Sequence, residues 1–203
     1  MLRRFFAAVY DTVSKGSEAA GMRDERRALL ANAEGATIEV GAGTGLNVEH
    51  YPDTVTRLVL TEPDRHMRRR LDRRLEGLDR PAETVDASAE DLPFPDDTFD
   101  TAVVTLVLCS VPSQEAALAE IARVVKPSGC LLFLEHVRSA EPKIAKRQDQ
   151  IRPLYHALAG CNPNRDTLAG IEASAFTVES VRQGEVPKAP KIERPMIVGS
   201  ARL

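Results

Sequence analysis

The sequence is poor in cysteine and contains no long hydrophobic run. Its 203 residues include three cysteines, Cys109, Cys130 and Cys161, an odd number without a Cys-x-x-Cys pair. This spacing supports neither a disulfide framework nor a zinc site, and it suits a reducing compartment. The apolar run that follows Arg3 and Arg4 is too short for a secretory signal or a spanning helix. We therefore predict a cytoplasmic protein with no metal site.

The chain also lacks a strong excess of either charge. Its net charge is −3 and 43% of its residues are hydrophobic, which describes a globular domain with no general attraction to nucleic acid. The segment 65–80 is rich in arginine, but apolar residues recur in it every three or four positions: Met67, Leu71, Leu75 and Leu78. This pattern predicts an amphipathic helix with an arginine-rich outer face. Without repeats or low-complexity segments, residues 1–203 are predicted to form a single domain.

Three glycines at alternate positions follow a short β-branched run. Thr37 to Val40 leads into Gly41, Gly43 and Gly45, and a helix-compatible segment begins at Leu46. Glycine is required where the backbone adopts positive φ or approaches a ligand, and the first N–H groups of a helix attract polar groups. The pattern therefore predicts a strand, a ligand-binding turn and a helix.

The spacing of these glycines narrows the class of ligand. A dinucleotide-binding loop has Gly-x-Gly-x-x-Gly, whereas the sixth position here is Leu46. The segment has no Gly-Lys-Ser/Thr ending, which excludes a nucleoside triphosphate loop. A nicotinamide-dependent reductase and a glycine turn without a ligand remain as alternatives.

Strand-like and helix-like segments alternate along the rest of the chain. The expected strands are Thr37–Val40, Arg57–Thr61, Glu83–Asp86, Phe99–Thr105, Cys130–Leu134, Phe176–Val181 and Pro195–Ala201. A helix is expected over Ser113–Val125, closed by Lys126–Gly129. We predict an α/β fold: a doubly wound, seven-stranded, mostly parallel Rossmann-like sheet with an antiparallel closing strand and N-terminal helices.

Two helices are expected before the first strand. The first carries an apolar stripe at helical spacing, formed by Phe5, Phe6, Val9, Tyr10 and Val13. The second is expected over Asp24–Asn32. We interpret residues 1–33 as a lid over the cofactor cleft. Simple packing on the sheet and attachment to a membrane surface through Arg3, Arg4 and the phenylalanines are the alternatives.

Polar residues at the carboxyl ends of the strands are candidate ligand contacts, because ligands of open parallel sheets bind there. Glu62 is expected to accept hydrogen bonds from the vicinal hydroxyls of a ribose, with a solvated strand-end acid as the alternative. Asp64 is expected to cap the next helix. Ser88 and Glu90 are expected near an adenine ring.

Five ordered motifs resemble the type 11 group of class I S-adenosylmethionine (SAM) methyltransferases, which includes the ubiquinone and menaquinone enzymes. They are Glu39–Gly45, Glu62, Ala89–Pro95, Phe99–Asp100 and Arg123–Gly129. A closer likeness, over nearly the whole chain, is to the animal methyltransferase-like proteins that methylate alkyl thiols. It rests on Thr105–Val111, Glu135–Val137, Gly160–Arg165 and Glu193–Pro195. Two departures are the missing hydrophobic anchor segment of those animal proteins and Ser88, where many type 11 members have aspartate.

The resemblance implies SAM as cofactor and a small-molecule acceptor as partner. With the strand-end argument, it predicts a cofactor-binding set of Glu39, Gly41, Ala42, Gly43, Gly45, Asn47, Glu62, Pro63, Ser88, Ala89, Glu90, Thr105 and Leu106. His136, at the end of the fifth strand, is the first catalytic candidate, and a structural histidine is the alternative. Tyr155 and His156 are further candidates, within a polar insert that also contains Cys161, Asn162, Arg165 and Asp166.

The predicted function is SAM-dependent methyl transfer to a small, apolar acceptor, with a thiol preferred because it needs little help to ionise. Alternatives are a quinone, phospholipid or other small-molecule methyltransferase, and a non-catalytic SAM-binding protein. Residues 34–140 are predicted to form the cofactor-binding core, and 141–203 the substrate-side insert with the closing β pair. We expect a monomer or homodimer that binds no nucleic acid, with membrane contact as a lesser alternative.

Overall fold

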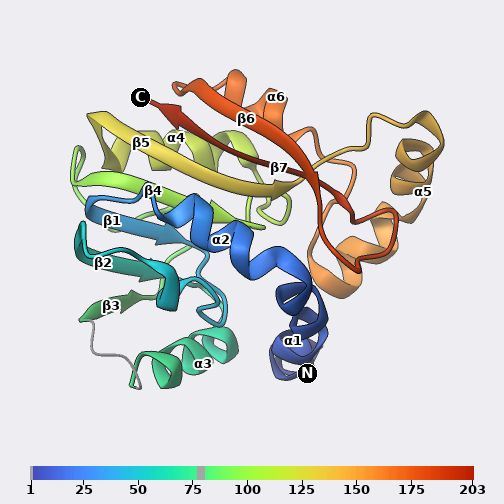
Figure 1. The fold of residues 1–203 in the computed structure, drawn as a ribbon, viewed down its shortest axis with the longest axis horizontal. Coiled ribbons are helices and arrows are strands. Elements are labelled where there is room, and N and C mark those ends of the chain that lie inside the picture. Colours follow the sequence, from blue (N-terminus) through green and yellow to red (C-terminus); the bar gives the residue numbers. More distant parts are fainter. Residues whose placement is uncertain (1, 77–80) are drawn as a thin grey trace.

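Seven strands form one sheet in the computed structural model, which describes residues 2–76 and 81–203 (Figure 1). The strands are β1 (Gly35–Val40), β2 (Val55–Thr61), β3 (Ala82–Val85), β4 (Phe99–Thr105), β5 (Val125–His136), β6 (Thr177–Glu185) and β7 (Pro195–Arg202). Their order across the sheet is β3-β2-β1-β4-β5-β7-β6.

The first five strands are parallel, and β7 runs antiparallel to both of its neighbours, β5 and β6. The predicted mostly parallel α/β sheet with an antiparallel closing strand is confirmed. The central strands are apolar along their length because helices cover both faces, and Val103 and Val104 of β4 are fully buried.

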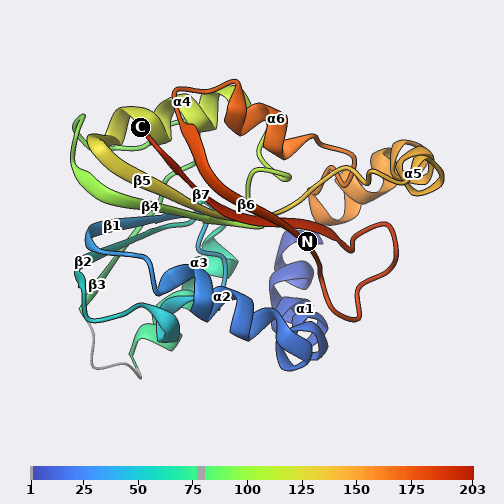
Figure 2. The same ribbon diagram turned by 45° about the horizontal axis from the view of Figure 1, so that its top comes forward.

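Helices lie on both faces of the sheet (Figure 2). They are α1 (Leu2–Ser17), α2 (Arg23–Leu30), α3 (Arg65–Leu75), α4 (Gln114–Val124), α5 (Pro142–Ala159) and α6 (Thr167–Glu172), with short turns η1 (Glu18–Met22) and η2 (Val48–His50). One core cluster joins the sheet to α4 and α6 through Leu118, Ile121 and Ile171. The other joins it to α2 and α3 through Leu30 and Leu71.

The two expected N-terminal helices are joined without a loop. A π-helical turn, η1, links α1 to α2, and Gly21 supplies the left-handed backbone at the bend, with φ 137°. Leu29 and Leu30 of α2 are buried. The side chains of α1 are described only from Tyr10 onward, so the predicted contacts of Phe5, Phe6 and Val9 lie outside the described residues.

Two local expectations were wrong. The helix expected to begin at Leu46 is only the single 3₁₀ turn η2, so no long helix points its N-terminus at the glycine loop. The helix expected over Ser113–Val125 is present as α4 and ends at Val124, but the segment Lys126–Gly129 that follows it belongs to β5, which is 12 residues long. Its strand conformation is fixed by β4, because Val125 pairs with Phe99 and Lys126 Nζ lies 2.6 Å from Asp100 Oδ1.

The arginine-rich helix α3 begins as expected, since Asp64 accepts hydrogen bonds from the backbone N–H groups of His66 and Met67. Met67 and Leu71 are buried, as the apolar stripe predicts, whereas Leu78 lies outside the described residues.

Several arginines of α3 pair with carboxylates: Arg68 with Asp86, and Arg70 and Arg74 with Asp11. The arginine-rich face is therefore partly internal, where it meets α1.

Within the described ranges, no helix combines the length and the apolar character needed to cross a bilayer. Cytoplasmic localisation, the oligomeric state and the absence of nucleic-acid partners stay predictions.

Candidate active site

The glycine loop connects β1 to η2 in a left-handed backbone that glycine adopts readily. Gly41, Gly43 and Gly45 have φ of 70°, 59° and 83°. A Cβ on Gly41 would lie 2.7 Å from Val107, and one on Gly45 would lie 2.6 Å from Leu71, whereas one on Gly43 would meet nothing within 4 Å. The outer glycines therefore allow close packing, and the middle glycine faces open space where a ligand can approach the backbone.

Glu62 fastens this loop from the end of β2. Its carboxylate accepts hydrogen bonds from the Gly43 N–H at 2.9 Å and from the Asp64 N–H at 2.8 Å. The residue is 8% exposed, and burial raises the pKa of its carboxyl. Each oxygen that accepts one N–H keeps a further lone pair. Glu62 can thus position the loop and still accept hydrogen bonds from a ligand.

A buried polar network lies beneath the loop. Glu39 accepts hydrogen bonds from Asn47 Nδ2 at 2.9 Å and from the Tyr51 hydroxyl at 2.6 Å. Asn47 Nδ2 also lies 3.0 Å from Thr105 Oγ1. Burial raises the pKa of Glu39 to about 7. Three predicted cofactor-binding residues, Glu39, Asn47 and Thr105, are thus brought together by one network.

Arg26 completes this network and was missed in the sequence. It is 3% exposed and donates to Asn47 Oδ1 at 3.0 Å, Thr105 Oγ1 at 3.2 Å and Glu18 Oε1 at 3.1 Å. The available signal was an arginine on the apolar face of the second helix, between Met22 and Leu30. Through Arg26, the N-terminal helices are connected to the ends of β1 and β4.

The helix α1 is attached to the glycine loop by a second set of contacts. The Thr44 hydroxyl donates to Asp11 Oδ1 at 2.5 Å, and Asp11 Oδ2 lies 3.5 Å from Arg74. Figures 1 and 2 show α1 next to α3, on the side toward which the arrows of β1 and β4 point. This helix therefore covers the carboxyl edge of the sheet, where ligands of such folds bind.

The segment after β3 forms a rigid turn at the same edge. Ser88 pairs with Asp91, and Ala89 is buried. The Glu90 carboxylate accepts a hydrogen bond from the Ser113 N–H at 3.3 Å, so it faces the start of α4.

At the neighbouring end of β2, Pro63 is exposed beside Glu62. The carboxyl ends of β2 and β3 are joined by the Glu62 N–H, which donates to the Val85 carbonyl at 3.0 Å.

A second group of side chains gathers beyond β4 and β5. Cys109, His136 and Cys161 each bring a potential ligand atom within 4.8 Å of the others. Burial lowers the pKa of His136, but contact with the Cys109 sulfur and the charges of Glu135 and Glu193 outweigh it and raise the pKa. The hydrogen bond to Cys161 and burial raise the pKa of the Cys109 thiol well above its usual value.

The structure separates the three catalytic candidates. Tyr155 lies close enough to Cys161 and Glu193 for both to contribute, after burial, to raising its pKa to about 12. His136 belongs to the same group, but His156 is exposed on α5.

The remaining polar residues of the insert bond to the backbone. Asn162 Nδ2 donates to the Cys109 carbonyl, and Arg165 donates to the Leu108 and Val111 carbonyls. Asp166 caps α6.

Comparison with known proteins identifies the family. A family model described as a methyltransferase domain, Methyltransf_11, matches residues 38–133. The thiol S-methyltransferase TMT1A of Homo sapiens is 31% identical over 194 residues, covering 89% of this chain and 79% of that protein. The chain belongs to the SAM-dependent methyltransferases.

Two further similarities concern the cofactor half and the fold. The ubiquinone/menaquinone biosynthesis C-methyltransferase UbiE of Ectopseudomonas mendocina (strain ymp) is 37% identical over 98 residues, covering 48% of this chain and 37% of that protein. A SAM-dependent methyltransferase of Thermotoga maritima, titled a possible histamine N-methyltransferase, superposes with a TM-score of 0.73 at 20% identity, covering 99% of this chain and 98% of that one. This methyltransferase therefore has the fold of the solved family members.

The residues at the carboxyl edge fit SAM. The cofactor carries a ribose with two vicinal hydroxyls, from which the Glu62 carboxylate can accept hydrogen bonds, and the open space beyond Gly43 lets the nucleoside approach the backbone. The carboxyl edge thus offers a hydrogen-bond acceptor and a surface without side chains, and SAM can use both.

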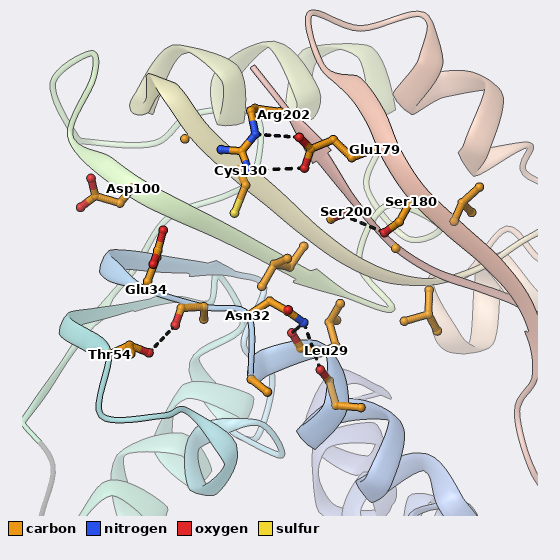
Figure 3. A pocket seen from close by; sticks show the side chains of 18 of the residues that line it. Leu29, Asn32, Glu34, Thr54, Asp100, Cys130, Glu179, Ser180, Ser200 and Arg202 are labelled. Atoms are coloured by element: carbon orange, nitrogen blue, oxygen red, sulfur yellow. Dashed lines mark hydrogen bonds and ion pairs between the residues drawn. The ribbon is translucent and has the colours of Figure 1, made fainter.

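A large cavity lies away from this edge. It has a volume of about 710 Å³ and lies between α2 and the strands β5, β7 and β6 (Figure 3). Its lining includes Asp100, Ser128 and Cys130, at the amino ends of β4 and β5, and the Arg202–Glu179 ion pair. Because these groups are at the opposite end of the strands from His136, we place the active site at the carboxyl edge instead.

Proposed function

We propose that this methyltransferase transfers the methyl group of SAM to the sulfur of small, apolar thiols. The observation that carries the proposal is the similarity to a human thiol S-methyltransferase over 89% of the chain. It includes the acceptor-side segments that contain Cys109, His136 and Cys161. A thiol with a pKa near 8.5 is a few per cent thiolate at neutral pH, so such an acceptor needs positioning more than a strong base.

We assign cofactor binding to the residues at the ends of β1, β2, β3 and β4. Glu62 holds the ribose hydroxyls, and the backbone of Gly41, Ala42, Gly43 and Gly45 lies against the nucleoside. Pro63 lies at the ribose, and Ser88, Ala89 and Glu90 lie near the adenine. The methionine part lies at Thr105 and Leu106. Glu39 and Asn47 support this edge from within the buried network.

Bound SAM supplies a methyl group on a sulfonium, which is already activated for transfer. The chain's own contribution is to orient the acceptor, to exclude water and to receive one proton. A ring nitrogen of His136 is the proposed proton acceptor, because this half-buried side chain lies at the end of β5 among the acceptor-side groups. Tyr155 is a proposed wall of the acceptor space. His156 is the least supported candidate, because it is exposed.

We also propose that residues 1–33 act as a lid, residues 34–140 as the cofactor core and 141–203 as the acceptor side, within one domain. The lid is supported by the two connections of the N-terminal helices to this edge, through Asp11 to Thr44 and through Arg26 to Thr105. A lid excludes water from the transferring methyl group.

A second candidate function is methylation of a quinol, which the 37% identity to UbiE favours. That similarity covers 48% of this chain. The similarity to TMT1A covers 89% of this chain, so we prefer a thiol to a quinol as the acceptor.

The test is methyl transfer from labelled SAM to a panel of small alkyl thiols, quinols and phospholipids, with S-adenosylhomocysteine release as a second readout. We expect turnover on the thiols alone. Turnover confined to quinols or phospholipids would overturn the thiol assignment. SAM binding without turnover on any acceptor would favour a non-catalytic SAM-binding protein.

A further inference from the structure

Three side chains with metal-binding atoms converge from distant parts of the sequence. Cys109 follows β4, His136 ends β5, and Cys161 follows α5. Their sulfur and nitrogen atoms all lie within 4.8 Å of one another, and Cys161 Sγ lies 4.0 Å from His136 Nδ1. Because the spacing along the chain matches no metal-binding motif, only the fold reveals this group.

The backbone around each of the three residues is held by side chains that are themselves buried. Glu135, which is 0% exposed, accepts the N–H groups of Val107, Leu108 and Cys109. Asn162, which is 5% exposed, donates both its backbone and its side-chain N–H to the Cys109 carbonyl, and thereby fixes the neighbouring Cys161.

The backbone of His136 is fixed in the same way, because its carbonyl accepts a hydrogen bond from the Thr167 hydroxyl at 3.0 Å. The three segments are therefore positioned in advance, as a metal site requires.

The donor set and the distances suit zinc. Two thiols and an imidazole are preferred zinc ligands, and bond lengths of about 2.3 and 2.0 Å in a tetrahedron place neighbouring ligand atoms roughly 3.6 Å apart. The observed separations, of up to 4.8 Å, are larger than this value, so the three ligand atoms would move closer together when the metal binds. Among the described residues, the buried Nε2 of His136 has no hydrogen-bond partner, and the other ring nitrogen, Nδ1, faces Cys161 Sγ.

We propose that Cys109, His136 and Cys161 bind a zinc ion whose fourth coordination position accepts the sulfur of the acceptor thiol. The identity of the fourth ligand rests on the proposed thiol methylation, whereas the zinc site itself does not. In this arrangement His136 is a zinc ligand instead of the proton acceptor proposed above, and the acceptor thiol loses its proton to water when it binds the metal.

The chemical step is balanced without an oxidant or reductant. The acceptor R–SH loses H⁺ to solvent and binds zinc as a thiolate, because a coordinated thiol is deprotonated. A sulfur lone pair then forms the new S–CH₃ bond as the bond from that methyl to the SAM sulfonium breaks. The products are a thioether and S-adenosylhomocysteine, and the neutral thioether leaves the metal because it is a weaker ligand.

Metal content is the first test. The full chain is produced with zinc in the medium and purified with a reductant and without chelators, and its zinc is measured by mass spectrometry. We expect about one zinc per chain in the wild type and in Cys130→Ser, and about one tenth of that in Cys109→Ser and Cys161→Ser. Cys130 is the matched control, because it lies six residues before His136 on β5, beside Thr101. Wild-type zinc no higher than in Cys161→Ser would overturn the proposal, as would a Cys109–Cys161 disulfide in place of metal.

Cobalt substitution keeps the test valid if a cysteine variant does not fold. Wild-type protein loaded with Co²⁺ should show thiolate-to-cobalt charge-transfer bands and the ligand-field bands of a tetrahedral site. A small alkyl thiol should shift both sets of bands. An octahedral cobalt spectrum would overturn the zinc site, and a tetrahedral spectrum that thiols leave unchanged would overturn the fourth-ligand assignment.

Turnover separates this inference from the proposed function. Removing zinc should lower kcat/KM for thiols by about 30-fold at neutral pH, and adding zinc should restore it. This factor is the ratio between a thiol that is fully ionised on the metal and a free thiol with a pKa near 8.5, which is only a few per cent ionised. Full turnover in zinc-free protein would overturn the metal's role while thiol methylation stands. Stoichiometric zinc without any thiol turnover would leave the metal site standing and remove the thiol assignment.

Discussion

Glu62 combines two tasks at the scale of a single residue. Its carboxylate fixes the Gly43 N–H and the Asp64 N–H, and it is also the group assigned to the ribose. Burial raises the pKa of its carboxyl, and the two backbone donors act against this effect by stabilising the charged form. A carboxylate that is already held in place loses little freedom when a ligand binds, which favours affinity.

Glu62→Ala is expected to weaken SAM binding by at least about 100-fold, because two charge-assisted hydrogen bonds are lost together. Isothermal titration calorimetry with SAM measures the effect. Glu83→Ala, which removes an exposed acid from β3, serves as the control and should bind normally. Near-wild-type affinity of Glu62→Ala would show that the ribose is held elsewhere.

The glycines of the loop are expected to differ in what they control. Gly45→Ala places a methyl 2.6 Å from Leu71 in a left-handed backbone, so it should lower the free energy of unfolding by about 2–3 kcal/mol. Gly43→Ala meets no atom within 4 Å and should cost about 1 kcal/mol from its backbone alone. Its methyl would instead intrude on the cofactor and lower SAM affinity by roughly tenfold or more.

Denaturant unfolding and calorimetry on the two variants separate these effects. Equal losses of stability and affinity in both would contradict the division between packing glycines and a ligand-facing glycine.

At the scale of elements, polar contacts connect the described side chains of α1 to the glycine loop and to α3. Asp11 receives the Thr44 hydroxyl and lies near Arg70 and Arg74 of α3. Partly exposed ion pairs of this kind contribute little to stability. Contacts of this kind can break at small cost, which is compatible with the lid that we propose.

Asp11→Ala is expected to loosen α1 while changing the free energy of unfolding by less than about 1 kcal/mol. Amide hydrogen exchange in α1 should accelerate, and SAM should dissociate several-fold faster. Asp24→Ala, which removes an exposed partner of Arg27 on α2, is the matched control. Unchanged exchange in α1 together with unchanged SAM dissociation would argue against a lid.

For the molecule as a whole, buried carboxyls link stability to pH. Burial raises the pKa of Glu39 and of Glu135 to about 7, from 4.5 in an exposed glutamate. The folded state therefore binds more protons than the unfolded state between these values, and stability falls as pH rises from about 4.5 to 7. Ion-paired acids with a lowered pKa, such as Glu120 at about 2, act in the opposite direction at lower pH.

Glu39→Gln should flatten this dependence, because an amide does not ionise. The difference between the free energies of unfolding at pH 5 and at pH 7.5 is expected to be smaller than in wild type, by at most about 3 kcal/mol. Urea unfolding at the two pH values provides the measurement, and Glu49→Gln, an exposed residue near the same loop, is the control. Parallel pH dependence in Glu39→Gln and wild type would mean that Glu39 is ionised throughout.

The sequence by itself determined the sheet and the cofactor loop, because their signals are local. Alternating apolar runs predict buried strands, and the glycines at 41, 43 and 45 have the positive φ that their spacing suggested. Local signals failed where long-range pairing decides the backbone. Lys126–Gly129 resembles a helix end but joins β5, because the neighbouring Val125 pairs with Phe99 and Lys126 is paired with Asp100.

Only the tertiary structure decided which polar residues act together. Arg26 reaches Thr105 across 79 positions of sequence, and Cys109 meets Cys161 across 52, so no spacing rule connects them. All parallel strands of a sheet end at the same edge, so the loops that follow them meet there even when they are far apart in the sequence. The chemistry of the acceptor side is a property of that edge, and the sequence alone carries only its separate parts.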